Sequence, residues 1–188
     1  MKKTIITIAG FPGSGKSSTA DLVAKELNFK RFSSGDFMRK IALDRGISLN
    51  ELSSIAENDT SVDYAIDEEV KKTKTMENIV IDSRLAFHWI PESFKVFLDL
   101  PPEIAKDRIY KSFQKNKLRQ QSEQSENIEE VFEKIKHRLE SEKKRYKELY
   151  SIDHTDKNNF DLIIDTQKNS LEEVADILIK EYKNWLNK

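Results

Sequence analysis

The stretch GFPGSGKS, residues 10–17, combines residue types at a spacing that suits phosphate binding. It matches the pattern G-x-x-x-x-G-K-[ST] without a mismatch, behind a run rich in Thr and Ile and ahead of a segment with helical periodicity. Glycine permits backbone angles at which successive N–H groups turn toward phosphate oxygens, and the positive end of the following helix adds to the attraction. The sequence therefore predicts a loop that binds a nucleoside triphosphate.

The side chains of this loop have separate expected roles. Lys16 supplies a positive charge for the β- and γ-phosphates, and the Ser17 hydroxyl is placed to ligate Mg²⁺. The residues expected to bind ATP are Gly10, Phe11, Pro12, Gly13, Ser14, Gly15, Lys16, Ser17 and Ser18. A glycine-rich turn that binds nothing is the alternative, and the complete match in this context argues against it.

Two short segments are candidates for holding the acceptor of the phosphoryl group. In FSSGDFMRK, residues 32–40, we expect a strand to end at Ser33 and Ser34 and Gly35 to allow a sharp turn. Arg39 then lies one turn into a helix, where its guanidinium could bind a phosphate through a fork of two hydrogen bonds.

The second segment, VIDSRLAFHW, places an acid and an arginine after a buried strand. Asp82 ends the strand and can hold the water shell of Mg²⁺, while Arg84 would meet the acceptor's phosphate. Asp99 and Asp165 also end strands, but only Asp82 is followed closely by an arginine. Each arginine taken alone is more typical of a surface residue, so the assignment depends on the combination.

A third group of arginines belongs to a long charged segment. Arg138 and Arg145 are seven residues apart, so they share a helix face with Glu142 between them, and Arg108 lies in the preceding helix. In-line phosphoryl transfer spreads charge over equatorial oxygens, which arginines can stabilise by closing over the site. Such a segment is usually interpreted as a solvated helix face whose salt bridges have no role in function. The phosphate loop favours the alternative interpretation, in which the arginines are catalytic.

Strands and helices must alternate to position these groups. Apolar runs at residues 4–9, 78–82, 95–100 and 161–165 are typical of buried parallel strands, with helical segments between them. Ser48 with Glu51 predicts a capping box, and Ser170 marks the start of the last helix. This order predicts a layered α/β fold.

Composition restricts the class of protein. The 188 residues suit one domain, and 32 basic against 33 acidic residues give a net charge of -1, so we expect neither nucleic-acid nor membrane binding. No cysteine is present, which excludes disulfides and thiolate metal sites and suits the cytoplasm. The histidines His88, His137 and His154 lack a metal-binding spacing and are expected to be surface or packing residues.

Four segments in this order, GFPGSGKSS, SSGDFMRKIA, SIAENDTSVDYAID and RLESEKKRYKELYSID, resemble the nucleoside monophosphate kinases, most closely the archaeal-type cytidylate kinases. The resemblance runs through DLIIDT, nearly the whole chain. It implies the three-layer fold of P-loop NTPases, with a five-stranded parallel sheet flanked by helices, a monophosphate-binding region and a mobile lid. Residues 1–188 would form one domain, with a core of 1–32, 79–107 and 151–188, a monophosphate-binding region of 33–78 and a lid of 108–150.

The resemblance also implies an activity, transfer of the γ-phosphoryl of MgATP to CMP or dCMP by a monomer that binds only small nucleotides. The catalytic residues would be Lys16, Arg108, Arg138 and Arg145. The monophosphate-binding residues would be Ser33, Ser34, Gly35, Asp36, Arg39 and Arg84, and the Mg²⁺ residues would be Ser17 and, through water, Asp82.

Alternative functions stay open. An adenylate kinase also carries GD followed by an arginine, but usually has D-G-F-P-R where this chain has DSRLA. A kinase of a small metabolite without phosphate would have less need of Arg39 and Arg84 to hold its acceptor. A nucleotide-binding regulator without turnover would not need the lid arginines, since it only binds and releases nucleotide. Residues 114–127 read like an inserted mobile loop. The unranked candidates for reading the base are Ser33, Asp59, Asp63 and Asp67.

Overall fold

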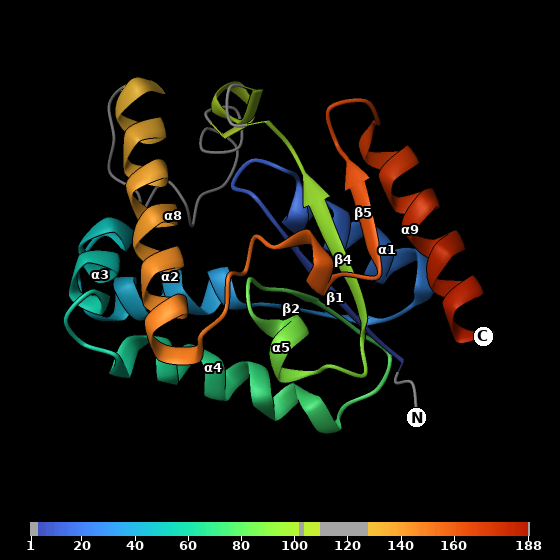
Figure 1. The fold of residues 1–188 in the computed structure, drawn as a ribbon, viewed down its shortest axis with the longest axis horizontal. Helices are drawn as coiled ribbons and strands as arrows, with labels where there is room; N and C mark the ends of the chain where they lie inside the picture. The colour runs from blue at the N-terminus through green and yellow to red at the C-terminus, as the bar shows by residue number, and fades with distance from the viewer. Residues whose placement is uncertain (1–3, 102–103, 110–127, 188) are drawn as a thin grey trace.

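The computed structural model describes residues 4–101, 104–109 and 128–187 of the 188-residue chain. The loop expected at 114–127 lies outside these residues. Five parallel strands form one sheet, as the resemblance implied, and their order is β2-β3-β1-β4-β5 (Figure 1). They are β1 (Ile5–Gly10), β2 (Lys30–Ser33), β3 (Ile79–Asp82), β4 (Phe94–Asp99) and β5 (Leu162–Asp165).

Helices lie between these strands and after β5. They are α1 (Lys16–Leu27), α2 (Ser34–Asp44), α3 (Leu49–Ala56), α4 (Ser61–Lys72), α5 (Ala86–Trp89), α8 (Ile128–Tyr150) and α9 (Leu171–Leu186). Two 3₁₀ turns, η1 (Thr73–Thr75) and η2 (Lys157–Asn159), precede β3 and β5, and residues 104–109 are also helical. Both expected helix starts are confirmed, because Ser48 with Glu51 and Ser170 with Glu173 form reciprocal capping boxes.

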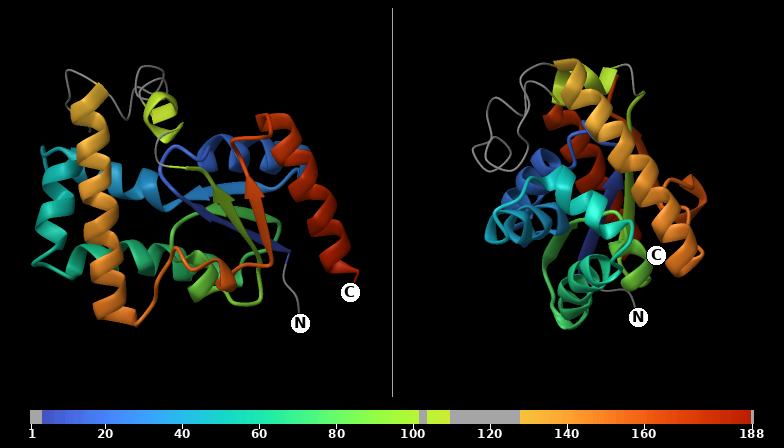
Figure 2. Two further views of the ribbon diagram at one scale, coloured as in Figure 1. Left: turned by 45° about the horizontal axis from the view of Figure 1, so that its top comes forward. Right: turned by 90° about the vertical axis from the view of Figure 1, so that its left-hand side faces the viewer.

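Helices cover both faces of the sheet (Figure 2). On one face, α1 and α9 pack against strand side chains such as Ile6 and Ile8, and Leu178 of α9 is fully buried there. On the opposite face, Ile5 and its neighbours pack against α4 and α5. The alternation of Ile5 and Ile6 between the faces explains why the strands are apolar throughout.

The helices α2, α3 and α4 have a small core of their own, formed by Met38, Ala42, Leu49, Leu52, Ala56 and Val62. The long helix α8 lies on the same side of the molecule as these three helices and away from α9 (Figures 1 and 2). No helix within the described ranges is long and apolar enough to cross a membrane.

Register brings the predicted groups to one edge of the sheet. Asp82, the last residue of β3, lies opposite Ile8 of β1 and Ser33 of β2. The strands are parallel, so the phosphate loop after β1, the start of α2 and the segment after β3 all leave the sheet at this edge.

Candidate active site

The phosphate loop joins β1 to α1 in the backbone conformation that its glycines predict. Gly10, Gly13 and Gly15 have φ values of 145°, 79° and 88°, which residues with a side chain rarely adopt. A Cβ added at Gly10 would collide with the carbonyl oxygen of Leu98 on the neighbouring strand. Lys16 Nζ donates to the carbonyl oxygens of Gly10 and Phe11, each at 2.9 Å, so the ammonium lies within the curve of the loop.

One cavity lies beside this loop and unites the three predicted groups. Its lining includes Pro12, Gly13, Gly15, Lys16, Ser17, Ser18, Ser33, Ser34, Gly35, Arg39, Asp82, Arg84, Arg108 and Arg138. Two apolar residues that were not predicted, Ile109 and Ile135, complete it. The predicted residues outside this lining are Gly10, Phe11, Ser14, Asp36 and Arg145.

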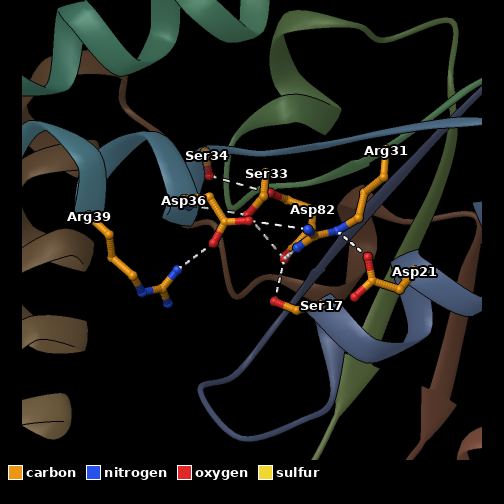
Figure 3. A network of polar contacts seen from close by, with 8 residues as sticks. All are labelled: Ser17, Asp21, Arg31, Ser33, Ser34, Asp36, Arg39 and Asp82. Carbon is orange, nitrogen blue, oxygen red and sulfur yellow. Dashed lines mark hydrogen bonds and ion pairs between the residues drawn. The ribbon is translucent and has the colours of Figure 1, made fainter. Parts of the chain in front are cut away.

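The expected metal-binding pair is in direct contact in the structure. Ser17 Oγ donates to Asp82 Oδ2 at 2.7 Å, and Ser33 Oγ lies 3.4 Å from the same oxygen (Figure 3). A hydroxyl and a carboxylate beside a phosphate loop are hard oxygen donors of the kind that Mg²⁺ prefers. The residues present therefore fit a magnesium ion bound together with phosphates.

The acceptor segment begins its helix earlier than the sequence suggested. Ser34 is the first residue of α2 and not a strand residue, because Ser33 caps the helix by accepting a hydrogen bond from the Asp36 N–H at 3.3 Å. Gly35 lies inside this helix without a left-handed φ, so the expected sharp turn at Gly35 is wrong. A Cβ at Gly35 would lie 3.2 Å from Arg39 Nη1, and the glycine thus gives that guanidinium room.

Arg84 and Arg138 share a buried carboxylate. Arg84 Nε contacts Glu142 Oε2, and Arg138 Nε lies 3.8 Å from Glu142 Oε1. Burial disfavours every charge here, yet the pKa of Glu142 is lowered and that of Arg84 is raised, because the opposite charges face one another. Both arginines line the cavity and Glu142 does not, so this carboxylate binds the two guanidinium groups from outside the cavity lining.

The other two candidate arginines have partners in different elements. Arg108 Nη2 donates to the carbonyl oxygen of Thr166, just after β5, at 2.8 Å. Arg145 Nε lies 2.7 Å from Asp63 Oδ2 on α4, which joins α8 to the helices α2, α3 and α4. Arg138 and Arg145 are only 8% and 5% exposed, which excludes a solvated face for this side of α8.

Comparison with known proteins places the chain in a family. A profile of the cytidylate kinase-like family matches residues 5–168. The chain belongs to this cytidylate kinase-like family. The cytidylate kinase of Methanocella arvoryzae is 34% identical over 177 residues, which cover 94% of this chain and 95% of that protein.

A second relative of this cytidylate kinase-like chain is longer. The S-adenosylmethionine-dependent nucleotide dehydratase of Lacinutrix mariniflava is 33% identical over 183 residues, 96% of this chain but only 36% of that protein. Among solved structures, shikimate kinase from Bacteroides thetaiotaomicron aligns with a TM-score of 0.63 at 15% identity, covering 96% of this chain and 98% of that one. This likeness supports the P-loop kinase fold and nothing finer.

The four candidates for base reading in the cytidylate kinase-like chain differ sharply in position. Among the residues described, Ser33 is the one of the four that lines the cavity. Asp63 is bound to Arg145, and Asp67 accepts hydrogen bonds from Trp89 Nε1 at 3.0 Å and Tyr150 Oη at 2.6 Å. Burial raises the pKa of both aspartates. Asp59 is exposed and lies two residues before α4, where its Oδ1 accepts a hydrogen bond from the Ser61 N–H.

Sequence reasoning missed several residues that hold the site of this cytidylate kinase-like chain together. Glu142 was noted between the two arginines of α8, but nothing in the sequence showed that Arg84 also meets it. Thr166, which receives Arg108, and Arg31, which contacts Asp36 and Asp82, carry no motif.

Proposed function

We propose that this protein transfers the γ-phosphoryl group of ATP to CMP or dCMP, giving ADP and the corresponding diphosphate. The observation that carries the proposal is the single cavity that Lys16 of the phosphate loop shares with Arg39 and Arg84 from the acceptor segments. An acceptor that already bears a phosphate explains why two arginines face the loop. This supports a monophosphate acceptor over a metabolite without phosphate.

Each residue has a role in this proposal. Lys16 holds the β- and γ-phosphates, and Arg39 and Arg84 hold the acceptor's α-phosphate. Arg108, Arg138 and Arg145 stabilise the charge that develops on the transferred group. Ser17 would hold Mg²⁺ directly and Asp82 would hold it through water, and the ion would neutralise charge on the β- and γ-phosphates.

The lid and the monophosphate-binding region belong to the same proposal. Residues 33–78 would bind the acceptor and residues 108–150 would close over the cavity, on a core formed by 1–32, 79–107 and 151–188. The separate small core of α2, α3 and α4 is consistent with such a region.

Cytosine is proposed as the base of the acceptor because relatives of this chain are cytidylate kinases. This chain matches only 36% of the dehydratase but 95% of the Methanocella arvoryzae cytidylate kinase. The comparison therefore favours a kinase activity for this chain. An adenylate kinase remains the alternative acceptor assignment, since the acceptor's base contacts are not identified by any motif.

The test is ADP release from MgATP with CMP, dCMP, UMP and AMP in turn. We expect CMP and dCMP to be the best acceptors and the Lys16→Ala variant to lose nearly all turnover. A preference for AMP of at least about tenfold in kcat/KM, about 1.4 kcal/mol of transition-state binding, would replace cytidylate by adenylate. No ADP release with any monophosphate would indicate a nucleotide-binding regulator.

A further inference from the structure

Arg31, the second residue of β2, contacts carboxylates from three different elements (Figure 3). Its Nε lies 3.2 Å from Oδ1 of Asp21 on α1. Its Nη1 lies 3.1 Å from Oδ2 of Asp36 on α2, and its Nη2 lies 3.4 Å from Oδ2 of Asp82 at the end of β3. All three guanidinium nitrogens therefore face an acid, and the side chain is only 22% exposed.

Two of these carboxylates, those of Asp82 and Asp36, also contact residues that line the proposed active-site cavity. Asp82 Oδ2, which Arg31 contacts, also accepts the hydrogen bond from Ser17 on the metal side. Asp36 contacts Arg31 through Oδ2 and Arg39 Nη1 through Oδ1, the latter at 2.9 Å. A continuous chain of charged contacts thus runs from the metal side to the acceptor side (Figure 3).

We propose that Arg31 is a positioning residue for the kinase reaction. It fixes Asp36, and through Asp36 it orients the guanidinium of Arg39 toward the acceptor's phosphate. It also partly neutralises Asp82 on the metal side. The inference rests on the proposed function of the cavity, whose lining does not include Arg31, so Arg31 acts through its partners.

Loss of Arg31 should change the affinities for the monophosphate and for Mg²⁺ in opposite directions. Without the forked guanidinium, the carboxylate of Asp36, 40% exposed, can rotate and release Arg39, which weakens binding of the monophosphate. Without the positive charge beside it, Asp82 becomes a stronger attractor of cations, so Mg²⁺ binds more tightly. A residue that merely stabilised the fold would weaken both ligands together.

The decisive experiment compares the Arg31→Gln variant with the unaltered protein by titration calorimetry. We expect the Kd for CMP, measured without ATP or metal, to rise on the order of tenfold because Arg39 is misplaced. We expect the Mg²⁺ concentration that half-saturates the gain in ATP binding to fall about two- to fivefold, the range of a partly exposed ion pair.

Two further variants separate charge from geometry. Arg31→Lys keeps the charge but lacks the planar fork, so the Kd for CMP should rise as in Arg31→Gln while the Mg²⁺ dependence stays at the unaltered value. Arg45→Gln removes an exposed arginine next to the end of α2 and should change neither measurement. If Arg31→Gln fails to fold, Arg31→Lys still decides whether the fork orients Arg39.

Two results would overturn the inference. One is a Kd for CMP in Arg31→Gln within about twofold of the unaltered protein, and the other is a joint loss of CMP and ATP binding together with a lower melting temperature. If the unaltered protein phosphorylates CMP, either result refutes the role of Arg31 alone. If it phosphorylates no monophosphate, the proposed function fails, and the Mg²⁺ titration of ATP binding still decides the Asp82 half of the inference.

Discussion

At the scale of single residues, His154 shows how burial controls charge next to the site. It is 3% exposed, its ring meets Tyr146 edge to face, and neither ring nitrogen has a hydrogen-bond partner in the described part of the chain. Burial lowers the pKa of His154 to about 4, and the charges that face it are those of Glu142, Arg84, Asp153 and Lys16. Of the two expected roles, surface or packing, the burial of His154 fits packing, with a ring that is neutral at pH 7.

This burial predicts a specific loss of stability in acid. Since the folded pKa of about 4 lies below the ordinary 6.5, the unfolded chain binds more protons between these values, and the free energy of unfolding falls as pH falls through this window. The contribution of His154 amounts to roughly 3 kcal/mol at 1.36 kcal/mol per pH unit. Denaturant titrations from pH 7 to pH 4 should show that His154→Gln removes this part of the slope.

The exposed His137 supplies the control for this experiment. His137→Gln should leave the slope between pH 7 and pH 4 in place, because this change leaves the buried ring of His154 unaltered. An equal slope for His154→Gln and the unaltered protein would show that other groups, such as the buried carboxylates, account for the acid sensitivity.

At the scale of elements, α8 presents two arginines with different surroundings. Arg138 lines the cavity, whereas Arg145 is bound to Asp63 on α4 and lies outside the cavity lining. Helix periodicity correctly placed both on one face, but each turn of α8 meets a different neighbour. The two residues should therefore respond differently to substitution.

Arg138→Ala should lower kcat and kcat/KM together, on the order of 10³-fold, if Arg138 stabilises the transferred group. Its loss of stability should be smaller than that of Arg145→Ala, because Glu142 keeps its contact with Arg84. Arg145→Ala should in addition lower the free energy of unfolding by about 3 kcal/mol, because Asp63 stays buried without its partner. Turnover at saturating MgATP and CMP and denaturant unfolding measure the two effects.

Removal of Asp63 distinguishes the two roles of Arg145. The double variant Asp63→Ala with Arg145→Ala should regain part of the lost stability, because no buried charge is left unpaired. Turnover should stay low in the double variant if Arg145 also acts on the phosphoryl group. Near-normal kcat in Arg145→Ala would limit this arginine to its ion pair.

At the scale of the whole molecule, the sheet and the group of helices α2, α3 and α4 have separate apolar cores. Leu178 of α9 is fully buried against the sheet, and Leu52 of α3 is fully buried in the core shared by α2, α3 and α4. Helix α2, which contributes to this second core, carries Arg39 and Asp36 of the proposed acceptor site. The proposed division of the chain into a core and a monophosphate-binding region predicts that damage to each has different consequences.

Leu52→Ala and Leu178→Ala should each reduce the free energy of unfolding by about 2 to 5 kcal/mol, because each leaves a cavity in a packed core. At a temperature where both variants stay folded, Leu52→Ala should raise the KM for CMP more than that for ATP. Leu178→Ala should leave the KM for CMP unchanged, since α9 packs on the face of the sheet opposite α4 and α5. Equal effects on both substrates would argue against the division.

The sequence by itself determined those features that depend on neighbours along the chain. The phosphate loop needs only glycines at fixed spacing between a strand and a helix, and both capping boxes join residues three positions apart, so their geometry follows from local backbone. Apolar runs likewise predicted the parallel sheet, because a strand buried on both faces must be apolar throughout.

Only the tertiary structure decided which distant charges meet. Periodicity shows that Arg138 and Glu142 share a helix face, but it does not show that Arg84 packs against that face or that Arg145 meets Asp63, 82 residues away. Arg31 stands in a strand without any motif, and its three acids come from different elements. The physical reason is that a buried charge must be paired with an opposite charge, and the packing of the helices on the sheet determines which opposite charge lies within reach. The spacing of residues along the chain does not determine that packing.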